Sequence, residues 1–125
     1  MSVYFSFFGG LFCIMKIECK DNLQMMRELQ SESIDLIYCD ILYGTGKTFA
    51  DYQDLKPEKN LIEQFYEPRL NEMHRLLKNT GTIYLQMDLR IVHWVRIMMD
   101  KIFGYNNFRN QIVVKFNIEI GRAHV

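Results

Sequence analysis

The fold of this chain is decided by residues 34–48, which read Ile34-Asp-Leu-Ile-Tyr-Cys-Asp-Ile-Leu-Tyr-Gly-Thr-Gly-Lys-Thr48. An apolar, β-branched run ends abruptly at Asp40, and a loop with two glycines follows it. Such a run is typical of a buried parallel strand, and open α/β sheets bind their ligands at the carboxyl ends of such strands. The segment therefore predicts a core strand that presents Asp40 and Tyr43 at a functional edge of a sheet.

Strand-like and helix-like segments alternate on both sides of this run. Before it, apolar periodicity and caps predict a strand over Lys16–Cys19 and a helix from Asp21 or Asn22 to Gln30. After it, they predict a helix that starts at Asn60 with Glu63 in a capping box and ends at Gly81, and then a strand over Thr82–Met87. A helix from Ile91 to Gly104 and a last strand over Gln111–Phe116 follow. This alternation predicts an α/β fold with a mostly parallel sheet and helices on both faces.

Composition places the chain among soluble globular domains. It has 125 residues, of which 49% are apolar and 24% charged, and its formal net charge is zero. The overall charge therefore gives no evidence for a general electrostatic attraction to nucleic acid. Three cysteines without paired spacing, Cys13, Cys19 and Cys39, indicate a reduced, cytoplasmic protein. The three histidines have no metal-ligand spacing with cysteines or carboxylates, so we expect no metal site.

The N-terminal residues Val3–Met15 are nearly all apolar. They lack the basic region and the small-residue cleavage site of a secretory signal, and they are too few to cross a bilayer. We therefore expect no membrane association and interpret residues 1–14 as an apolar N-terminal arm.

The four residues Asp40-Ile41-Leu42-Tyr43 resemble the Asp-Pro-Pro-Tyr motif of the amino-group DNA methyltransferases. The resemblance continues through Met73–Leu85 and Asp100–Val113, and it covers roughly Met15–Val114. The chain is similar to the permuted bacterial restriction-modification methyltransferases, in which the catalytic half comes first. The resemblance implies a partial Rossmann-like methyltransferase fold and transfer of a methyl group from S-adenosylmethionine to adenine N6, favoured here over cytosine N4.

The resemblance also implies roles for individual residues. Asp40 and the carbonyl of Ile41 would accept hydrogen bonds from the target amino group, and Tyr43 would stack on a base flipped out of the duplex. Leu42 completes the motif, while Asp21 and Asp40 would contact the cofactor. The implied partners are double-stranded DNA and a restriction or specificity subunit.

The sequence departs from the family pattern in two ways. Ile41 and Leu42 replace two prolines, which we expect to loosen the loop and to add two backbone N–H donors beside the target amino group. The family's glycine-rich cofactor loop lies downstream of the matched region, and residues 117–125 resemble nothing in the family. We therefore divide the chain into the arm, a partial catalytic domain over 15–116 and a non-family tail over 117–125, and expect a truncated, impaired enzyme.

Two alternatives come from other classes of protein. Gly44-Thr45-Gly46-Lys47-Thr48 matches the end of a phosphate-binding Gly-x-x-x-x-Gly-Lys-Ser/Thr motif and follows a strand, which would suit a nucleotide triphosphatase. The motif's first glycine would fall at Ile41, however, and no helix is predicted directly after the loop. The other alternative is an inactive fragment that keeps the fold and at most binds a partner.

Overall fold

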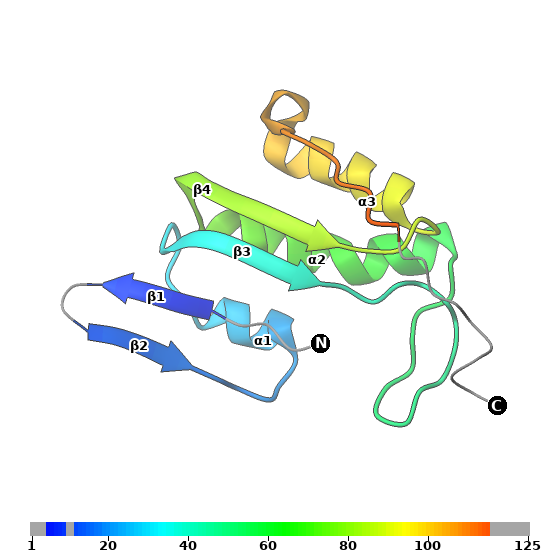
Figure 1. Ribbon diagram of the computed structural model, residues 1–125, viewed down its shortest axis with the longest axis horizontal. Coiled ribbons are helices and arrows are strands. Elements are labelled where there is room, and N and C mark those ends of the chain that lie inside the picture. Colours follow the sequence, from blue (N-terminus) through cyan, green and yellow to red (C-terminus); the bar gives the residue numbers. More distant parts are fainter. Residues whose placement is uncertain (1–4, 10–11, 116–125) are drawn as a thin grey trace.

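A computed structural model of the chain describes residues 5–9 and 12–115 (Figure 1). Its first two strands, β1 (Phe5–Gly9) and β2 (Phe12–Lys16), pair as an antiparallel hairpin. In chain order, these are followed by α1 (Asn22–Arg27), β3 (Ile34–Asp40), α2 (Lys59–Leu76), β4 (Leu77–Gln86) and α3 (Val92–Met99). A π-helical turn, Asp100–Gly104, and a 3-10 turn, Tyr105–Asn107, come after α3.

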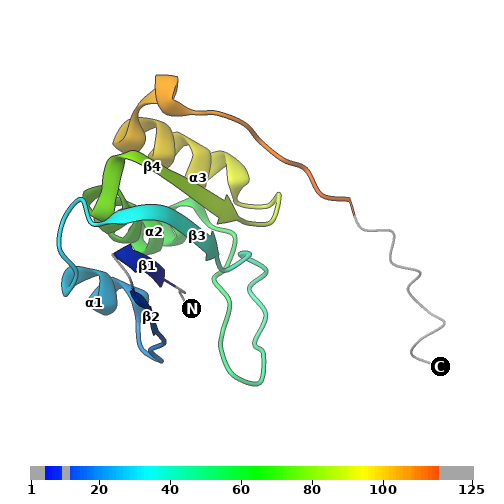
Figure 2. The same ribbon diagram turned by 60° about the vertical axis from the view of Figure 1, so that its left-hand side comes forward.

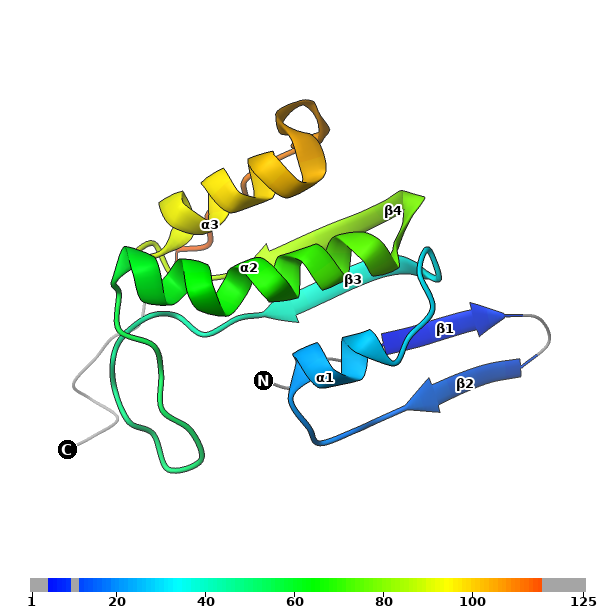
Figure 3. The same ribbon diagram turned by 180° about the vertical axis from the view of Figure 1, so that it is seen from behind.

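The parallel pair of β3 and β4 is the centre of the fold. The two strands run side by side from the Leu36–Thr82 pair to the Asp40–Gln86 pair, and α2 is the crossover between them (Figure 3). The predicted strand is therefore confirmed over its whole length, but it is buried on one face only. The chain has the small α/β fold that the alternation indicated. The sheet with parallel strands has two strands in the described residues.

The core lies between β3 and the helices, on one face of this pair. Its buried side chains come from α1, from β3 and the residue after it, from α2, and from the start and body of α3: Met25, Met26, Ile34, Ile37, Cys39, Ile41, Ile62, Tyr66, Leu70, Met73, Leu76, Ile91, Val95 and Met98. Burial, and then the charge of Asp40, raise the pKa of the Cys39 thiol to about 11, so it behaves as a small core residue as predicted.

The other face of the pair is open in the part of the chain that the structure describes. Leu36, Tyr38 and Tyr84 on this face are 57%, 54% and 52% exposed. α2 lies behind the sheet in Figure 1, and α3 packs against α2 and lies above β4 in that view. The prediction of helices on both faces is thus not met within these residues, because no described helix covers this second face.

The observed helix boundaries correct two predicted ones. α2 begins at Lys59 after Glu58, whose side chain makes no capping hydrogen bond, so Asn60 lies inside the first turn and the capping box is not formed. α2 also ends at Leu76, and Gly81 lies within β4 instead of ending the helix. Leu76 and Leu77 span this helix–strand junction and no glycine or proline lies there, so the sequence carries no stop signal at the junction.

Two predicted strands are also wrong. Residues 17–19 have no regular structure, since the strand lies earlier, at Phe12–Lys16, where β1 supplies a hairpin partner. Residues 111–115 are likewise irregular, and Ile112, Val113 and Val114 are 72%, 69% and 64% exposed. A strand needs a neighbour for its backbone hydrogen bonds, and the described residues offer none there. Residue 116, the tail over 117–125 and part of the arm over 1–14 lie outside the described residues.

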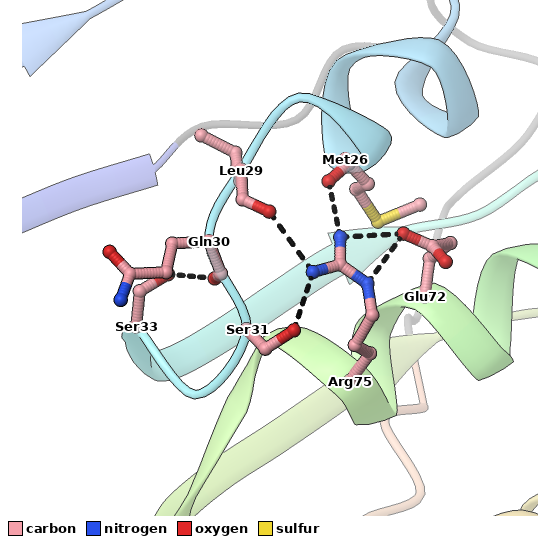
Figure 4. Close-up of polar contacts among 7 residues, drawn as sticks. All are labelled: Met26, Leu29, Gln30, Ser31, Ser33, Glu72 and Arg75. Carbon is pink, nitrogen blue, oxygen red and sulfur yellow. Dashed lines mark hydrogen bonds and ion pairs between the residues drawn. The ribbon is translucent and has the colours of Figure 1, made fainter.

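Arg75, near the end of α2, holds the segment that leads into the amino-terminal end of β3 (Figure 4). Its guanidinium donates to the carbonyls of Met26 and Leu29 at 2.8 and 3.0 Å, to the hydroxyl of Ser31 at 2.9 Å, and to Glu72 Oε2 at 2.7 and 3.0 Å. Arg75 therefore fastens the end of α1 and the turn into β3 to the crossover helix. This anchor positions the strand that carries Asp40.

Candidate active site

The predicted catalytic segment follows directly from the carboxyl end of β3. Asp40 is exposed and pairs with Gln86 at the last register position of the parallel pair. The ladder continues one residue further, because the Ile41 N–H donates to the Gln86 carbonyl at 3.0 Å. The Ile41 side chain is only 3% exposed, and the Leu42 carbonyl accepts a hydrogen bond from the Tyr66 hydroxyl at 3.0 Å. The segment is thus held by the sheet, the core and α2.

The Tyr43 hydroxyl is hydrogen-bonded at the same carboxyl edge of the β3–β4 pair. Gln86 Nε2 donates to the Tyr43 hydroxyl at 2.9 Å, and Gln86 Oε1 accepts a hydrogen bond from the Tyr38 hydroxyl. The Gln86 hydrogen bond lowers the pKa of Tyr43, but partial burial and the hydrogen bond and charge of Asp40 together raise this pKa above its ordinary value. Asp40, Tyr43 and Gln86 therefore form one polar group at the end of β3 and β4.

A buried carboxylate organises the glycine loop that comes next. Asp54 is 5% exposed and accepts hydrogen bonds from the backbone N–H groups of Gly44, Thr45 and Leu55 at 3.1, 2.8 and 2.8 Å, and from the Thr45 hydroxyl at 2.6 Å. Burial raises the pKa of Asp54, but these hydrogen bonds outweigh it and hold the pKa below its ordinary value. Sequence reasoning missed Asp54, since nothing in a polar loop marks one acid as buried.

This arrangement argues against the phosphate-binding interpretation of the loop. Asp54 already occupies the backbone N–H groups of Gly44 and Thr45, which a phosphate would need. Residues 46–55 form a short antiparallel turn, closed by a bridge between Thr48 and Gln53, and α2 does not begin until Lys59. The loop projects past the carboxyl end of β3 (Figure 2) instead of leading into a helix that could hold phosphate.

Asp21, the other predicted cofactor contact, already has structural partners. Its Oδ1 accepts from the N–H groups of Leu23 and Gln24 at 2.9 and 3.3 Å, and caps α1. Its Oδ2 accepts from Arg69 Nη2 at 2.7 Å. Burial raises the pKa of Asp21, but Arg69 and the two capping bonds outweigh it and hold this pKa below its ordinary value. A carboxylate has about four acceptor positions, so one remains for a ligand.

Metal and membrane features can be assessed for residues 5–9 and 12–115. In these ranges no group of three or more His, Cys, Asp or Glu side chains could hold a metal ion. Of the helices that they form, none is long and apolar enough to cross a membrane.

Residues 34–123 match the family described as DNA methylase, the N6 and N4 amino-methyltransferases, and this range is more than half of the chain. The chain belongs to this family. One relative is the type II methyltransferase M.KpnI of Klebsiella pneumoniae, which is 36% identical over 104 residues, covering 75% of this chain and 25% of the relative. Another is the type III restriction-modification enzyme StyLTI Mod subunit of Salmonella typhimurium, 29% identical over 130 residues, covering 80% of this chain and 20% of the relative.

The DNA adenine methyltransferase YhdJ of Escherichia coli K12 is 29% identical over 83 residues, covering 66% of this chain and 28% of the relative. This DNA methylase chain thus spans about a quarter of the length of the curated relatives that it matches. No solved structure matches it significantly.

The structure corrects one expectation about how this chain departs from the family motif. We expected Ile41 and Leu42 to loosen a segment that two prolines stiffen in other DNA methylases. The Ile41 N–H is instead used by the Gln86 carbonyl, and the Leu42 carbonyl by Tyr66. The Ile41 N–H is therefore not a free donor beside Asp40, and the segment is held without prolines.

Proposed function

We propose that this chain forms the catalytic part of a DNA methyltransferase that transfers a methyl group from S-adenosylmethionine to adenine N6, with cytosine N4 as the alternative target. The observation that carries the proposal is the exposed Asp40 at the carboxyl end of β3, followed by a segment held by both β4 and α2, in a chain that matches the DNA methylase family over residues 34–123. The relative named as a DNA adenine methyltransferase favours adenine.

The chemistry needs acceptors and a stacking ring at fixed positions. An exocyclic amino group is a poor nucleophile because its lone pair is delocalised into the base, so its N–H groups must be held by acceptors in line with the incoming methyl. We assign this to the Asp40 carboxylate and the Ile41 carbonyl, and we assign stacking on the flipped base to Tyr43, which is 36% exposed. Leu42 contributes its carbonyl to Tyr66 and so fixes the backbone between acceptor and ring.

S-adenosylmethionine supplies an electrophilic methyl group when bound. Asp40 fits a contact with the cofactor because its carboxylate is exposed at the strand end. Asp21 fits one further hydrogen bond, since its side chain is 55% exposed and three of its acceptor positions are taken. We therefore propose Asp21 and Asp40 as the residues of this chain that contact the cofactor.

The proposed macromolecular partner is double-stranded DNA. A restriction or specificity subunit is a second proposed partner, since one relative is named as the Mod subunit of a type III restriction-modification enzyme. We place this function in the cytoplasm. The alternative is an inactive fragment that keeps the fold and at most binds a partner.

The test is transfer of radiolabelled methyl from S-adenosylmethionine to mixed-sequence duplex DNA. The chain is assayed alone and then together with the part of M.KpnI that lies outside the matched region. We expect transfer only in the second case, and loss of at least a hundredfold in Asp40→Ala. Asp51→Ala, which removes an exposed acid from the projecting loop, is the matched control and should keep full activity. Absence of transfer in both cases would favour the inactive fragment.

A further inference from the structure

Gln86 meets the candidate catalytic segment through both its backbone and its side chain. Its carbonyl accepts the Ile41 N–H at 3.0 Å, and Gln86 pairs with Asp40 at the end of the parallel ladder. Its side-chain amide lies between two phenols, donating to the Tyr43 hydroxyl at 2.9 Å and accepting from the Tyr38 hydroxyl. The three side chains come from β3, the segment after it and β4.

The Gln86 amide joins the two phenols in one direction. Its NH₂ group donates to the Tyr43 hydroxyl, which accepts this hydrogen bond. The amide oxygen faces the Tyr38 hydroxyl, which donates to it. A glutamine satisfies both tyrosines at once, whereas a glutamate has no proton for Tyr43.

We propose that Gln86 is a positioning residue for the target-base pocket, which holds the Tyr43 ring in place beside Asp40 from the neighbouring strand. This inference rests on the proposed function, in which Tyr43 stacks on the flipped base. Gln86 touches neither base nor cofactor in this scheme and acts through Tyr43. Its side chain is exposed and lies on the open face of the sheet, so replacing it leaves the core intact.

The direct test follows the ionisation of Tyr43 in this chain, labelled with ¹³C at the tyrosine Cζ atoms and titrated by NMR. Tyr43→Phe assigns the resonance. In Gln86→Leu the donor that favours the phenolate is lost, so the pKa of Tyr43 should rise by about 0.5–1, the size expected for one hydrogen bond. In Gln86→Glu the donor is lost and a negative charge is added, so the pKa should rise further. Tyr105, in the 3-10 turn after α3 and away from this sheet, should not change.

Gln64→Leu is the matched control, because Gln64 is an exposed glutamine on α2, on a different element from the site. It should leave every tyrosine pKa unchanged. A general loss of structure in Gln86→Leu would move all tyrosine resonances together, and Gln86→Glu then decides the question. A Tyr43 pKa that is the same in wild type, Gln86→Leu and Gln86→Glu would overturn the inference.

The same variants in the complemented methyl-transfer assay separate this inference from the proposed function. If Gln86 positions Tyr43, Gln86→Leu should lower transfer about tenfold or more while Gln64→Leu retains it. Transfer by the wild type with an unchanged Tyr43 pKa in Gln86→Leu would leave the proposed function standing and reject the positioning role. No transfer by the complemented wild type would reject the proposed function, whatever the titration shows.

Discussion

Replacing Ile41 by proline, the residue of the family motif, should destabilise this chain. The Ile41 N–H donates to the Gln86 carbonyl at 3.0 Å, and proline has no N–H, so this hydrogen bond is lost at a cost of about 1 kcal/mol. The Ile41 side chain is 3% exposed, and the smaller, differently shaped ring removes about one buried carbon, which costs about 1 kcal/mol. Proline gains back about 0.4–1 kcal/mol through the unfolded state. The expected net loss is about 1–2 kcal/mol.

Leu42→Pro is the matched control, since the only hydrogen bond of Leu42 among the described residues uses its carbonyl, which proline keeps. Its stability should stay within about 1 kcal/mol of wild type. Urea unfolding followed by circular dichroism gives the free energies, and Ile41→Pro should also lower Tm by about 3–10 °C. An Ile41→Pro variant as stable as wild type, or more stable than Leu42→Pro, would refute the idea that the ladder bond and the buried side chain hold this segment.

Two further outcomes test the glycine loop. The folded-state pKa of Asp54 lies below its unfolded value of 3.8, so the stability that this carboxylate contributes is fully present above pH 3.8 and is lost as the pH falls through the folded pKa. The Asp54→Asn variant should therefore be less stable than wild type at pH 7 and should lose less stability on acidification. Urea unfolding from pH 7 to pH 2 measures both effects. Since Asp54 already holds the loop N–H groups, titration with Mg-ATP or Mg-GTP should show no saturable binding below millimolar concentrations by calorimetry, and a micromolar Kd would revive the nucleotide triphosphatase alternative.

The fold could be predicted where one local signal is strong. The run from Ile34 to Asp40 is apolar and β-branched and is cut off by a loop, and its strand has these bounds in the structure. Asp21 or Asn22 was predicted to cap the first helix, and Asp21 is the residue that caps α1. The junction of α2 and β4 was misplaced because Leu76 and Leu77 suit either element, and tertiary pairing with β3 decides between them.

The site could be predicted only along the chain, not across it. Asp40 and Tyr43 were placed at the strand end because Asp40 is the last residue of β3 and Tyr43 lies three residues further along the chain. Gln86 and Asp54 were missed, because each reaches the segment from another part of the chain. A glutamine at the end of a strand and an acid in a polar loop are common surface residues. Nothing in one sequence marks Gln86 as a partner of a residue 43 positions away, or Asp54 as a partner of one 10 positions away.

The segment after β3 can be restricted either by the two prolines of the family motif or by the two apolar residues found here, through different physical means. Proline fixes φ and so restricts the segment through its own covalent geometry. Ile41 instead extends the β3–β4 ladder by one hydrogen bond and anchors its side chain in the core, so the restriction depends on β4 being in place. Because Gln86 provides both that carbonyl and the amide beside Tyr43, the Ile41 backbone and the Tyr43 ring are held by the same residue. Displacing the end of β4 should therefore disturb the proposed acceptor and the proposed stacking ring together, whereas in a proline-containing segment the backbone would keep its local geometry.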